Sequence, residues 1–264
     1  MGNGRDDVAI DEQTDRHAGR ASIPEWASAE VGAGSLVLSG PALRLDLIDA
    51  QRDPDIAADC YRKKQTCYAR FGAAAASVSL SDGISAEDLH LVTATDCDSG
   101  AIVASVSVYR RGADKPLPIE RAIGHHASMR AEIAGWDGRR IAEMSGLWAE
   151  DAWRKTGLSE SLLHAAMAAC RVLGAEKIVA FGHQHLLGFY ETVGLLPDAS
   201  LGRFSYPDPS YVSTVMRADP LGFLTVPAGK RARVFGFAEG MARGEPIFWR
   251  GFDECIAAER GVRA

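Results

Sequence analysis

Residues 140–181 decide the fold, and they read RIAEMSGLWAEDAWRKTGLSESLLHAAMAACRVLGAEKIVAF. The first nine predict a β-strand, in which alternation places on one face Ile141, Glu143, Ser145 and Leu147. A polar loop then leads to Gly157, and apolar residues recur at helical spacing from Ser159 until Gly174. The apolar run 177–181 predicts a second strand. A strand–loop–helix–strand unit of this kind makes the two strands parallel neighbours in one sheet.

The flanking segments add antiparallel strands and further helices, so the fold class is α/β with a mixed central sheet. Two β-type runs around the turn Asp98-Ser99-Gly100 predict a hairpin. Its strands are residues 89–95 and 102–109, and other strands are expected at 36–38, 43–48 and, as the last one, 211–217. Helices are expected at 54–71, after the break at 115–120 to about 134, at 187–193, 237–243 and 252–260. We predict a flexible N-terminal arm (1–34), one domain (35–217) and a C-terminal extension packed on it (218–264).

The composition excludes several functional classes. The chain has 264 residues, 47% of them apolar, and a formal net charge of −6, which disfavours a nucleic-acid binder that works by neutralising phosphates. Its five cysteines form no CxxC pair, so neither a disulfide framework nor a zinc site is expected, and the location is predicted to be cytoplasmic. No apolar run reaches 18 residues, so no membrane span is expected. The oligomeric state stays open.

The loop Arg154-Lys155-Thr156-Gly157-Leu158-Ser159 has the properties of a phosphate cradle. It precedes a helix, whose first N–H groups are unpaired and carry the positive end of the helix dipole. A glycine allows close backbone approach, and the two basic residues add full charges. An ordinary solvated basic turn is the alternative interpretation of these six residues.

Glu143 and Tyr190 are the candidate chemical groups, although the residues alone leave their roles open. A carboxylate within a strand either points to solvent or lies in a cleft, and a buried tyrosine hydroxyl often only needs a hydrogen-bond partner. His183 and His185 follow the second parallel strand and could line the acceptor site or supply the base. No third ligand accompanies the histidine pairs, so we expect no metal.

Together, the loop, the strand carboxylate and the segment Phe189-Tyr190-Glu191-Thr192-Val193-Gly194-Leu195 resemble the GCN5-related N-acetyltransferase (GNAT) superfamily over roughly residues 88–217. The resemblance implies a splayed parallel strand pair whose gap receives the pantetheine arm of a thioester. Carried over by position, the phosphates of coenzyme A would be held by Arg154, Lys155, Thr156, Gly157, Leu158 and Ser159. Backbone bonds to pantetheine would come from Met144, Ser145, Gly146, Leu147 and Trp148. Tyr190 would be the acid and Glu143 the base, while His183 stands where many members carry asparagine.

A narrower resemblance points to the N-acyl amino acid synthase and acyl-homoserine-lactone synthase branch. It rests on Leu117-Pro118-Ile119-Glu120, on the strand 142–147, and on Cys60-Tyr61-Arg62-Lys63, which is similar to a Y-R-x-R element. That branch uses longer acyl chains, often from acyl carrier protein. The sequence departs from it at Gly146, where those enzymes carry arginine.

The predicted function is therefore direct N-acyl transfer from a coenzyme A or phosphopantetheine thioester to the primary amine of a small molecule, with acyl carrier protein as a possible partner. Strand N–H groups near Leu147 would polarise the thioester carbonyl. Two alternatives stay open. One is a non-catalytic acyl-CoA-binding or regulatory module. The other is a short-chain acetyltransferase, in which the bulky Met144 and Trp148 shorten the acyl site.

Overall fold

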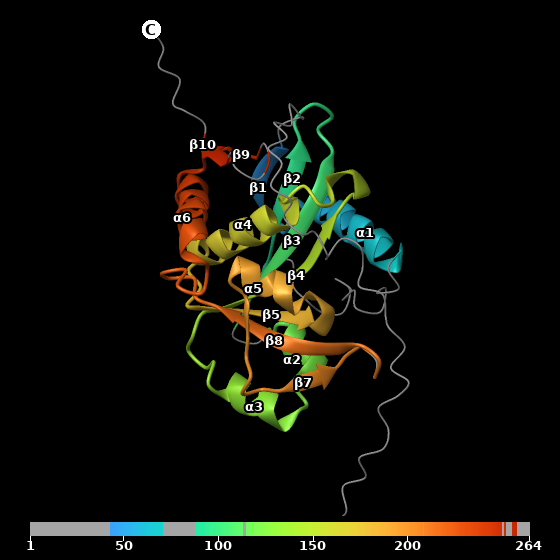
Figure 1. Cartoon of the computed structure of the whole chain (residues 1–264), viewed down its shortest axis with the longest axis vertical. Helices are drawn as coiled ribbons and strands as arrows, with labels where there is room; N and C mark the ends of the chain where they lie inside the picture. Colours follow the sequence, from blue (N-terminus) through green and yellow to red (C-terminus); the bar gives the residue numbers. More distant parts are fainter. Residues whose placement is uncertain are drawn as a thin grey trace, which may run out of the picture.

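A computed structural model describes residues 43–70, 88–112, 115–207, 209–249, 251 and 255–257. The predicted arm (1–34) and the strand expected at 36–38 lie outside this part of the chain. Within it, ten strands form one mixed sheet in the order β10-β9-β1-β2-β3-β4-β5-β8-β6, with β7 paired to β8 (Figure 1). The strands are β1 (Leu43–Asp49), β2 (Leu89–Asp96), β3 (Ile102–Arg110), β4 (Ile141–Ala149), β5 (Lys177–His183), β6 (Leu196–Pro197), β7 (Arg203–Ser205), β8 (Val212–Ala218), β9 (Ile247–Trp249) and β10 (Cys255–Ala257). The helices are α1 (Pro54–Arg70), α2 (Pro118–Ile123), α3 (Ala127–Ala134), α4 (Leu158–Val172), α5 (Leu187–Val193) and α6 (Ala228–Arg243).

The central unit follows the sequence prediction. β4 and β5 are parallel neighbours, and β2 and β3 form the expected antiparallel hairpin. α4 connects β4 to β5 with its apolar row fully buried, including Leu162, Ala166 and Cys170. Gly174 then adopts φ +80°, a left-handed conformation that suits glycine and stops the helix.

Two separate cores cover the two faces of the sheet. The core on the α4 side joins β2 and β3 to α4 and α6, and includes Val92, Val108, Leu162, Met167 and Phe237. The core on the α1 side joins the same strands to α1, α2 and α3, and includes Leu91, Tyr109, Cys60, Ile119 and Met129. Side chains of β4 therefore reach different surroundings according to the face on which they lie.

The predicted single helix ending near residue 134 is wrong, because the segment forms two helices. α2 begins at Pro118, inside the expected break, and its last turn closes where the Gly124 N–H bonds to Glu120 O. His126 then takes an extended conformation, with φ −72° and ψ 139°, before α3 begins. An extended residue ends the helical hydrogen-bond ladder, which a count of apolar residues does not reveal.

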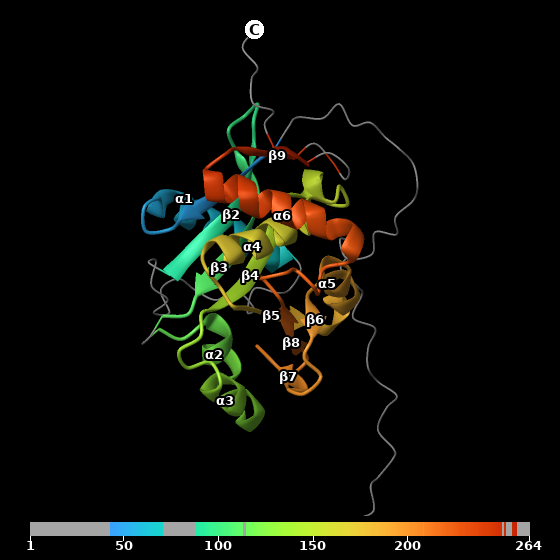
Figure 2. The same ribbon diagram turned by 90° about the vertical axis from the view of Figure 1, so that its left-hand side faces the viewer.

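The C-terminal segment also differs from the prediction. β8 is not the last strand, because β9 pairs with β1 and β10 pairs with β9. The expected helix at 237–243 is part of the longer α6, which lies across α4 (Figure 2). The helix expected at 252–260 is contradicted at residues 255–257, which are a strand.

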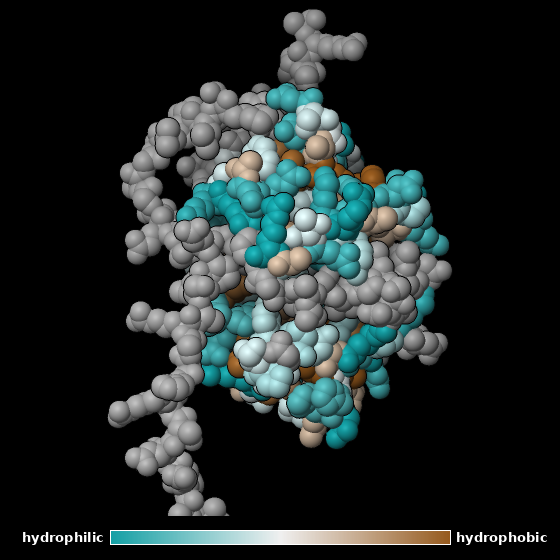
Figure 3. All heavy atoms as spheres, turned by 90° about the vertical axis from the view of Figure 1, so that its right-hand side faces the viewer, coloured by the Kyte–Doolittle hydropathy of each residue, from teal (hydrophilic) through white to brown (hydrophobic). Residues whose placement is uncertain are grey.

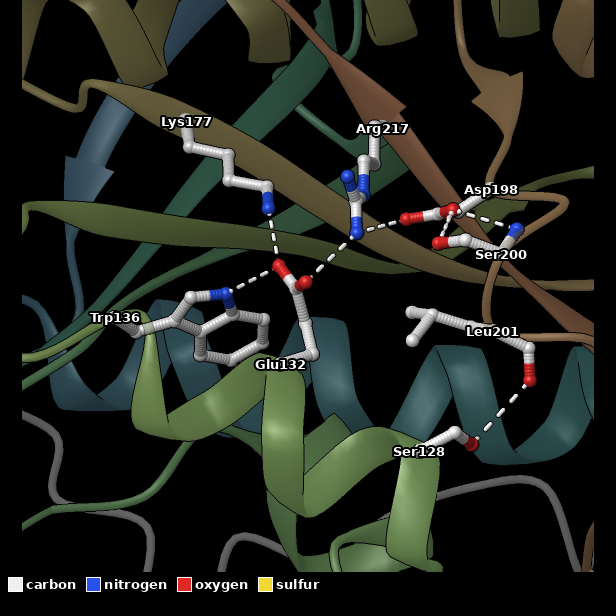
Figure 4. Close-up of polar contacts among 8 residues, drawn as sticks. All are labelled: Ser128, Glu132, Trp136, Lys177, Asp198, Ser200, Leu201 and Arg217. Atoms are coloured by element: carbon white, nitrogen blue, oxygen red, sulfur yellow. Dashed lines mark hydrogen bonds and ion pairs between the residues drawn. The ribbon is translucent and has the colours of Figure 1, made fainter.

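A network of charged side chains fastens α3 to the far end of the sheet (Figure 4). Glu132 of α3 accepts hydrogen bonds from Lys177 of β5 and from Trp136 Nε1, the latter at 2.7 Å. Arg217 of β8 lies 2.9 Å from Glu132 and also pairs with Asp198. These contacts fix α3 against β5 and β8.

Candidate active site

β4 and β5 separate partway along their length. Their pairing runs from Ile141 opposite Lys177 to Met144 opposite Ala180 and then ends. β4 nevertheless continues to Ala149. In Figure 1, β5 and β8 turn away from β2, β3 and β4. Beyond Met144, β4 pairs only with β3 among the described strands, so its other edge is open between two diverging strands.

A β-bulge lies where the strands separate. The register between β3 and β4 shifts by one residue between Ser105 and Ser107, and Gly146 has φ +66°. Leu147 consequently turns to the α4 side, so the prediction that it shares a face with Glu143 is wrong. Trp148 lies on the α1 side instead. The prediction assumed that side chains alternate between the two faces along the whole strand. The extra residue of the bulge moves every later side chain to the other face.

The open edge of β4 meets side chains from the C-terminal half of α1. Tyr68 Oη donates to Leu147 O at 3.1 Å, and Cys67 Sγ lies 3.9 Å from Ala149 O. One of the backbone groups expected to face pantetheine thus has a partner within the protein. Sequence reasoning missed Tyr68, whose only signal was its place beside the inward row of the helix.

Glu143 lies one residue before the end of the β4–β5 pairing and is 2% exposed. Its Oε2 accepts a hydrogen bond of 2.8 Å from the N–H of Ile119, in the first turn of α2. Burial raises the pKa of Glu143 to about 8. The hydrogen bond from Ile119 acts to lower this pKa, and the charge of Glu120 raises it slightly. The side chain is therefore inside the protein rather than on an exposed edge, and it holds its proton at neutral pH.

Tyr190 lies across the gap, on α5. A Cβ at Gly182 of β5 would come within 2.8 Å of its ring, so the ring packs directly on the end of β5 that lies beyond the pairing with β4. Burial, with a smaller contribution from Tyr211, raises the pKa of Tyr190. Burial is the largest cause of the raised pKa of Tyr68, and Tyr190 is the second largest. The two hydroxyl groups therefore lie in one region of the protein. The structure thus brings Tyr190 close to Tyr68, which bonds to β4, whereas Glu143 lies with Ile119 on the α1 side of the sheet.

The predicted phosphate loop surrounds the start of α4. Lys155 and Gly157 both have positive φ, 59° and 85°, and Gly157 is the residue that caps the helix. Arg154 lies 2.7 Å from Asp151, and Lys155 is exposed. Thr156 Oγ1 donates to Trp153 O and accepts from Leu158 N. The loop is therefore a tight turn that presents cationic side chains and the N-terminus of a 15-residue helix.

The other residues predicted to bind the phosphates or pantetheine are partly in the core and partly at the surface. Leu158 and Met144 are fully buried in the core on the α4 side, so they offer only backbone groups. Ser159, Ser145 and Gly146 are partly exposed. Trp148 is 3% exposed, and no hydrogen-bond partner reaches its Nε1.

His183 is the last residue of β5 and His185 follows shortly after it, among aromatic rings. His183 Nδ1 accepts from the N–H of His185, and its ring centre is 3.8 Å from that of Tyr211. Burial lowers the pKa of His183, with a smaller effect from His185. Among the described residues, no group of three or more His, Cys, Asp or Glu side chains is placed to hold a metal ion.

Comparison with known proteins identifies the fold. No protein-family model matches the chain, and a search of curated proteins finds no significant match. Two of the solved structures that this chain resembles are CoA-dependent acyl-homoserine lactone synthases. BjaI is 12% identical, covers 75% of this chain and 90% of its own, and has a TM-score of 0.52. MesI is 13% identical, covers 73% and 95%, and has a TM-score of 0.51. FeeM, an N-acyl amino acid synthase from uncultured soil microbes, is a weaker match at 12% identity, coverage of 71% and 93%, and a TM-score of 0.49.

The protein therefore has the fold of the GNAT acyltransferases, as the sequence resemblance implied. Within that fold it resembles acyl-homoserine lactone synthases. No helix in the described part of the chain is long and apolar enough to cross a membrane.

Proposed function

We propose that this protein is an N-acyltransferase that moves an acyl group from a pantetheine thioester to the primary amine of a small molecule. The observation that carries the proposal is the separation of β4 from β5 at a bulge that is followed by the glycine-capped start of α4. An open strand edge offers backbone groups to the amides of pantetheine. The helix start and the cations beside it suit the phosphates of coenzyme A or of a carrier-bound phosphopantetheine.

In this proposal the donor lies along the open edge of β4, from Met144 to Trp148, with its phosphates at Arg154 to Ser159. Tyr68 Oη then gives up its bond to Leu147 O wherever pantetheine needs that carbonyl. N–H groups beside the bulge polarise the thioester carbonyl as negative charge develops on its oxygen.

Glu143 and Tyr190 move the protons. The amine nitrogen attacks the carbonyl carbon, and Glu143, directly or through water, takes the proton that the nitrogen loses. The carbon–sulfur bond breaks, and the leaving sulfur takes the proton of the Tyr190 hydroxyl. Burial keeps Tyr190 protonated and therefore able to act as an acid, whereas Glu143 becomes a base only as the pH approaches its pKa of about 8.

A second candidate is a non-catalytic acyl-CoA-binding module. The observation that favours it is that Glu143 is 2% exposed and bonded to the Ile119 N–H, the arrangement of a structural cap for α2. Turnover separates the two. Release of free thiol from an acyl-CoA in the presence of an amine supports the enzyme, and binding without release from any amine supports the module.

Ligand-dependent thermal unfolding tests the donor site. We expect coenzyme A, acetyl-CoA or a long-chain acyl-CoA at one hundred times its Kd to stabilise the protein by about 2.7 kcal/mol. A long-chain preference favours the synthase branch, and an acetyl preference favours a short-chain acetyltransferase.

Gly157→Val should abolish the shift, because a branched side chain cannot adopt φ +85° without strain and would block the helix start. Gly174→Val is the matched control, since Gly174 has φ +80° just beyond the opposite end of α4, with nothing within 4 Å of its Cβ position. An equal loss of the ligand shift in both variants, or no shift in the wild type with any donor, would overturn the assignment.

A further inference from the structure

Lys64 is a buried primary amine that the acyl-transfer chemistry above does not use. It belongs to the row of α1 that faces the sheet, together with Ala57 and Cys60, and is 6% exposed. The surface on the α1 side is mostly hydrophilic where Figure 3 colours it, so α1 has ample polar surface on which to carry a lysine. Solubility therefore does not explain a lysine that is turned inward.

The amine of Lys64 lies beside the bulge of β4. A Cβ on Gly146 would lie 3.0 Å from Lys64 Cδ and 3.5 Å from its Nζ. One further carbon–carbon bond of about 1.5 Å puts Nζ within about 5 Å of Gly146 Cα. Tyr68, one helical turn further along α1, donates a hydrogen bond to Leu147 O. The same face of α1 therefore brings an amine and a hydroxyl to the place where β4 has left β5.

The amine has no ion-pair partner in the described part of the chain. The one interaction of its charge there is with the ring of Tyr61, at 4.9 Å from the ring centre. The neighbouring Lys63 differs, because it donates to Ile102 O at 2.7 Å. Burial without a counterion disfavours the ammonium form and lowers the pKa of Lys64 to about 8. About a tenth of this amine is then neutral at pH 7, against less than about one in a thousand for an ordinary lysine.

A neutral primary amine is the nucleophile that the proposed reaction needs. In that reaction, N–H groups beside the bulge hold the oxygen of the thioester carbonyl, at about 3 Å in a normal hydrogen bond. The carbonyl carbon would then lie a few ångströms from Gly146, as the amine of Lys64 does. The four-carbon stem of a lysine is flexible, so Nζ can close to the roughly 3–3.5 Å that attack requires. Lys64 therefore offers the donor an amine when no acceptor is bound.

We propose that the protein acylates itself at Lys64 when a thioester donor is bound and no acceptor amine is present. The inference rests on the proposed function and adds a form of regulation to the same site. The neutral Nζ attacks the carbonyl carbon and forms an amide bond. The carbon–sulfur bond breaks, and the sulfur leaves as a thiol with the proton that Nζ loses. The product is an uncharged N-acyl-lysine beside the bulge, which occupies the donor edge of β4 and stops further turnover.

Mass spectrometry of the full-length protein tests the proposal. The wild type is incubated with acetyl-CoA, and separately with octanoyl-CoA, in the absence of any other amine, and peptide mapping locates the acyl groups. With at least one donor, we expect occupancy at Lys64 to exceed that at every other lysine at least about tenfold. The reason is that a bound thioester has a high effective concentration at that one amine. Thiol release should stop at about one equivalent per protein.

The variants assign the acylation to this amine. Lys64→Arg should abolish both the mass gain and the thiol release, because a guanidinium keeps its proton. Lys64→Met should give the same result without the larger head group, and the melting temperature of each variant shows that it folds. Lys63→Met, one position away, is the matched control and should be acylated as the wild type is. Gly157→Val, which should lose the donor, should reduce occupancy at Lys64 to that of the other lysines.

Two results would overturn the proposal by indicating unassisted chemical acylation. One is equal occupancy at Lys64 and at the other lysines, and the other is occupancy at Lys64 that Gly157→Val leaves unchanged. Failure of the proposed function is distinguishable. If no acyl-CoA shifts the thermal unfolding and no lysine is acylated, the donor site is wrong and both proposals fail. A thermal shift without a mass gain at Lys64 refutes self-acylation alone.

Discussion

Glu143 has a structural contact and is also the candidate base of the proposed reaction. Its carboxyl group supports the first turn of α2 through the Ile119 N–H, and it also lies where the strands separate. Burial is the largest cause of the raised pKa of this carboxyl group, which is about 8. Catalytic bases are often tuned towards the working pH in this way. The two roles predict different dependences on pH.

For Glu143→Gln we expect thiol release to fall by roughly 10²–10⁴-fold, the range for loss of a general base. The wild-type rate should rise with pH through about 8, because the base works deprotonated, and the variant should lack this limb. The folded-state pKa is above the unfolded value, so the stabilising contribution of Glu143 is present at low pH and lost as the pH rises through about 8. Melting temperatures between pH 5 and 9 should consequently fall more for the wild type than for the variant. Parallel pH profiles in both proteins would contradict a titrating Glu143.

Gly182 positions Tyr190, because a Cβ there would come within 2.8 Å and 3.0 Å of two ring atoms. Gly182→Ala should displace the ring and lower kcat about tenfold or more, since small misplacements of reacting groups are costly. The overpacked site should also cost about 1–3 kcal/mol of stability. Gly188→Ala in α5 is the matched control, with nothing within 4 Å of its Cβ position. If both variants keep full turnover, the position of Tyr190 is not important for the chemistry.

At the scale of elements, a charged network attaches α3 to two strands of the sheet. The network around Glu132 ties α3 to β5 and β8 (Figure 4). Burial alone would raise the pKa of Glu132, but hydrogen bonds from Lys177 and Trp136, together with the charges of Lys177 and Arg217, lower it. The carboxylate is therefore stabilised in its ionised form.

Glu132→Gln should destabilise the protein by roughly 1–3 kcal/mol, because two partly buried cations lose a counterion. A lowered folded-state pKa means that this contribution is present above the unfolded pKa and disappears as the pH falls through the folded value. The difference in urea unfolding between variant and wild type should thus shrink below about pH 4. Glu176→Gln, which breaks the more exposed pair with Arg140, should cost at most about 1 kcal/mol. Equal effects of the two changes would show that the network is no stronger than a surface pair.

Across the whole molecule, the sequence predicted the elements with long, regular patterns. The unit from Ile141 to His183 followed from strand alternation, a helical apolar row and the glycines at the two ends of α4. The short C-terminal strands β9 and β10 have three residues each, too few to show a period, and they form because β1 offers a free edge. Their pairing depends on contacts between distant parts of the chain.

Only part of the candidate site could be predicted, because some of its features also depend on contacts between distant parts of the chain. The loop at Gly157 and the residues Glu143 and Tyr190 were recognisable because motifs carry them. The bulge at Gly146 was not, since an extra residue in one strand appears only when its partner strand is known. Tyr68 was missed because its bond to Leu147 O depends on which strand α1 covers. Its place beside the inward row of α1 was the one available signal.

The same long-range dependence predicts that the C-terminal strands stabilise the start of α4. Trp249 Nε1 of β9 donates to Ser161 Oγ in the first turns of α4 at 3.0 Å, and both groups are buried. Its ring also contacts Trp153, just before the predicted phosphate loop, with centres 6.1 Å apart.

A double-mutant cycle measures this connection. Trp249→Phe should cost about 1–3 kcal/mol, because it shrinks a buried ring and leaves the Ser161 hydroxyl without its donor. Adding Ser161→Ala should recover part of that loss, since an apolar pair leaves no polar group unsatisfied. The coupling energy from urea unfolding should then be at least about 0.5 kcal/mol. Strictly additive losses would show that the C-terminal strands pack beside α4 without supporting it through this bond.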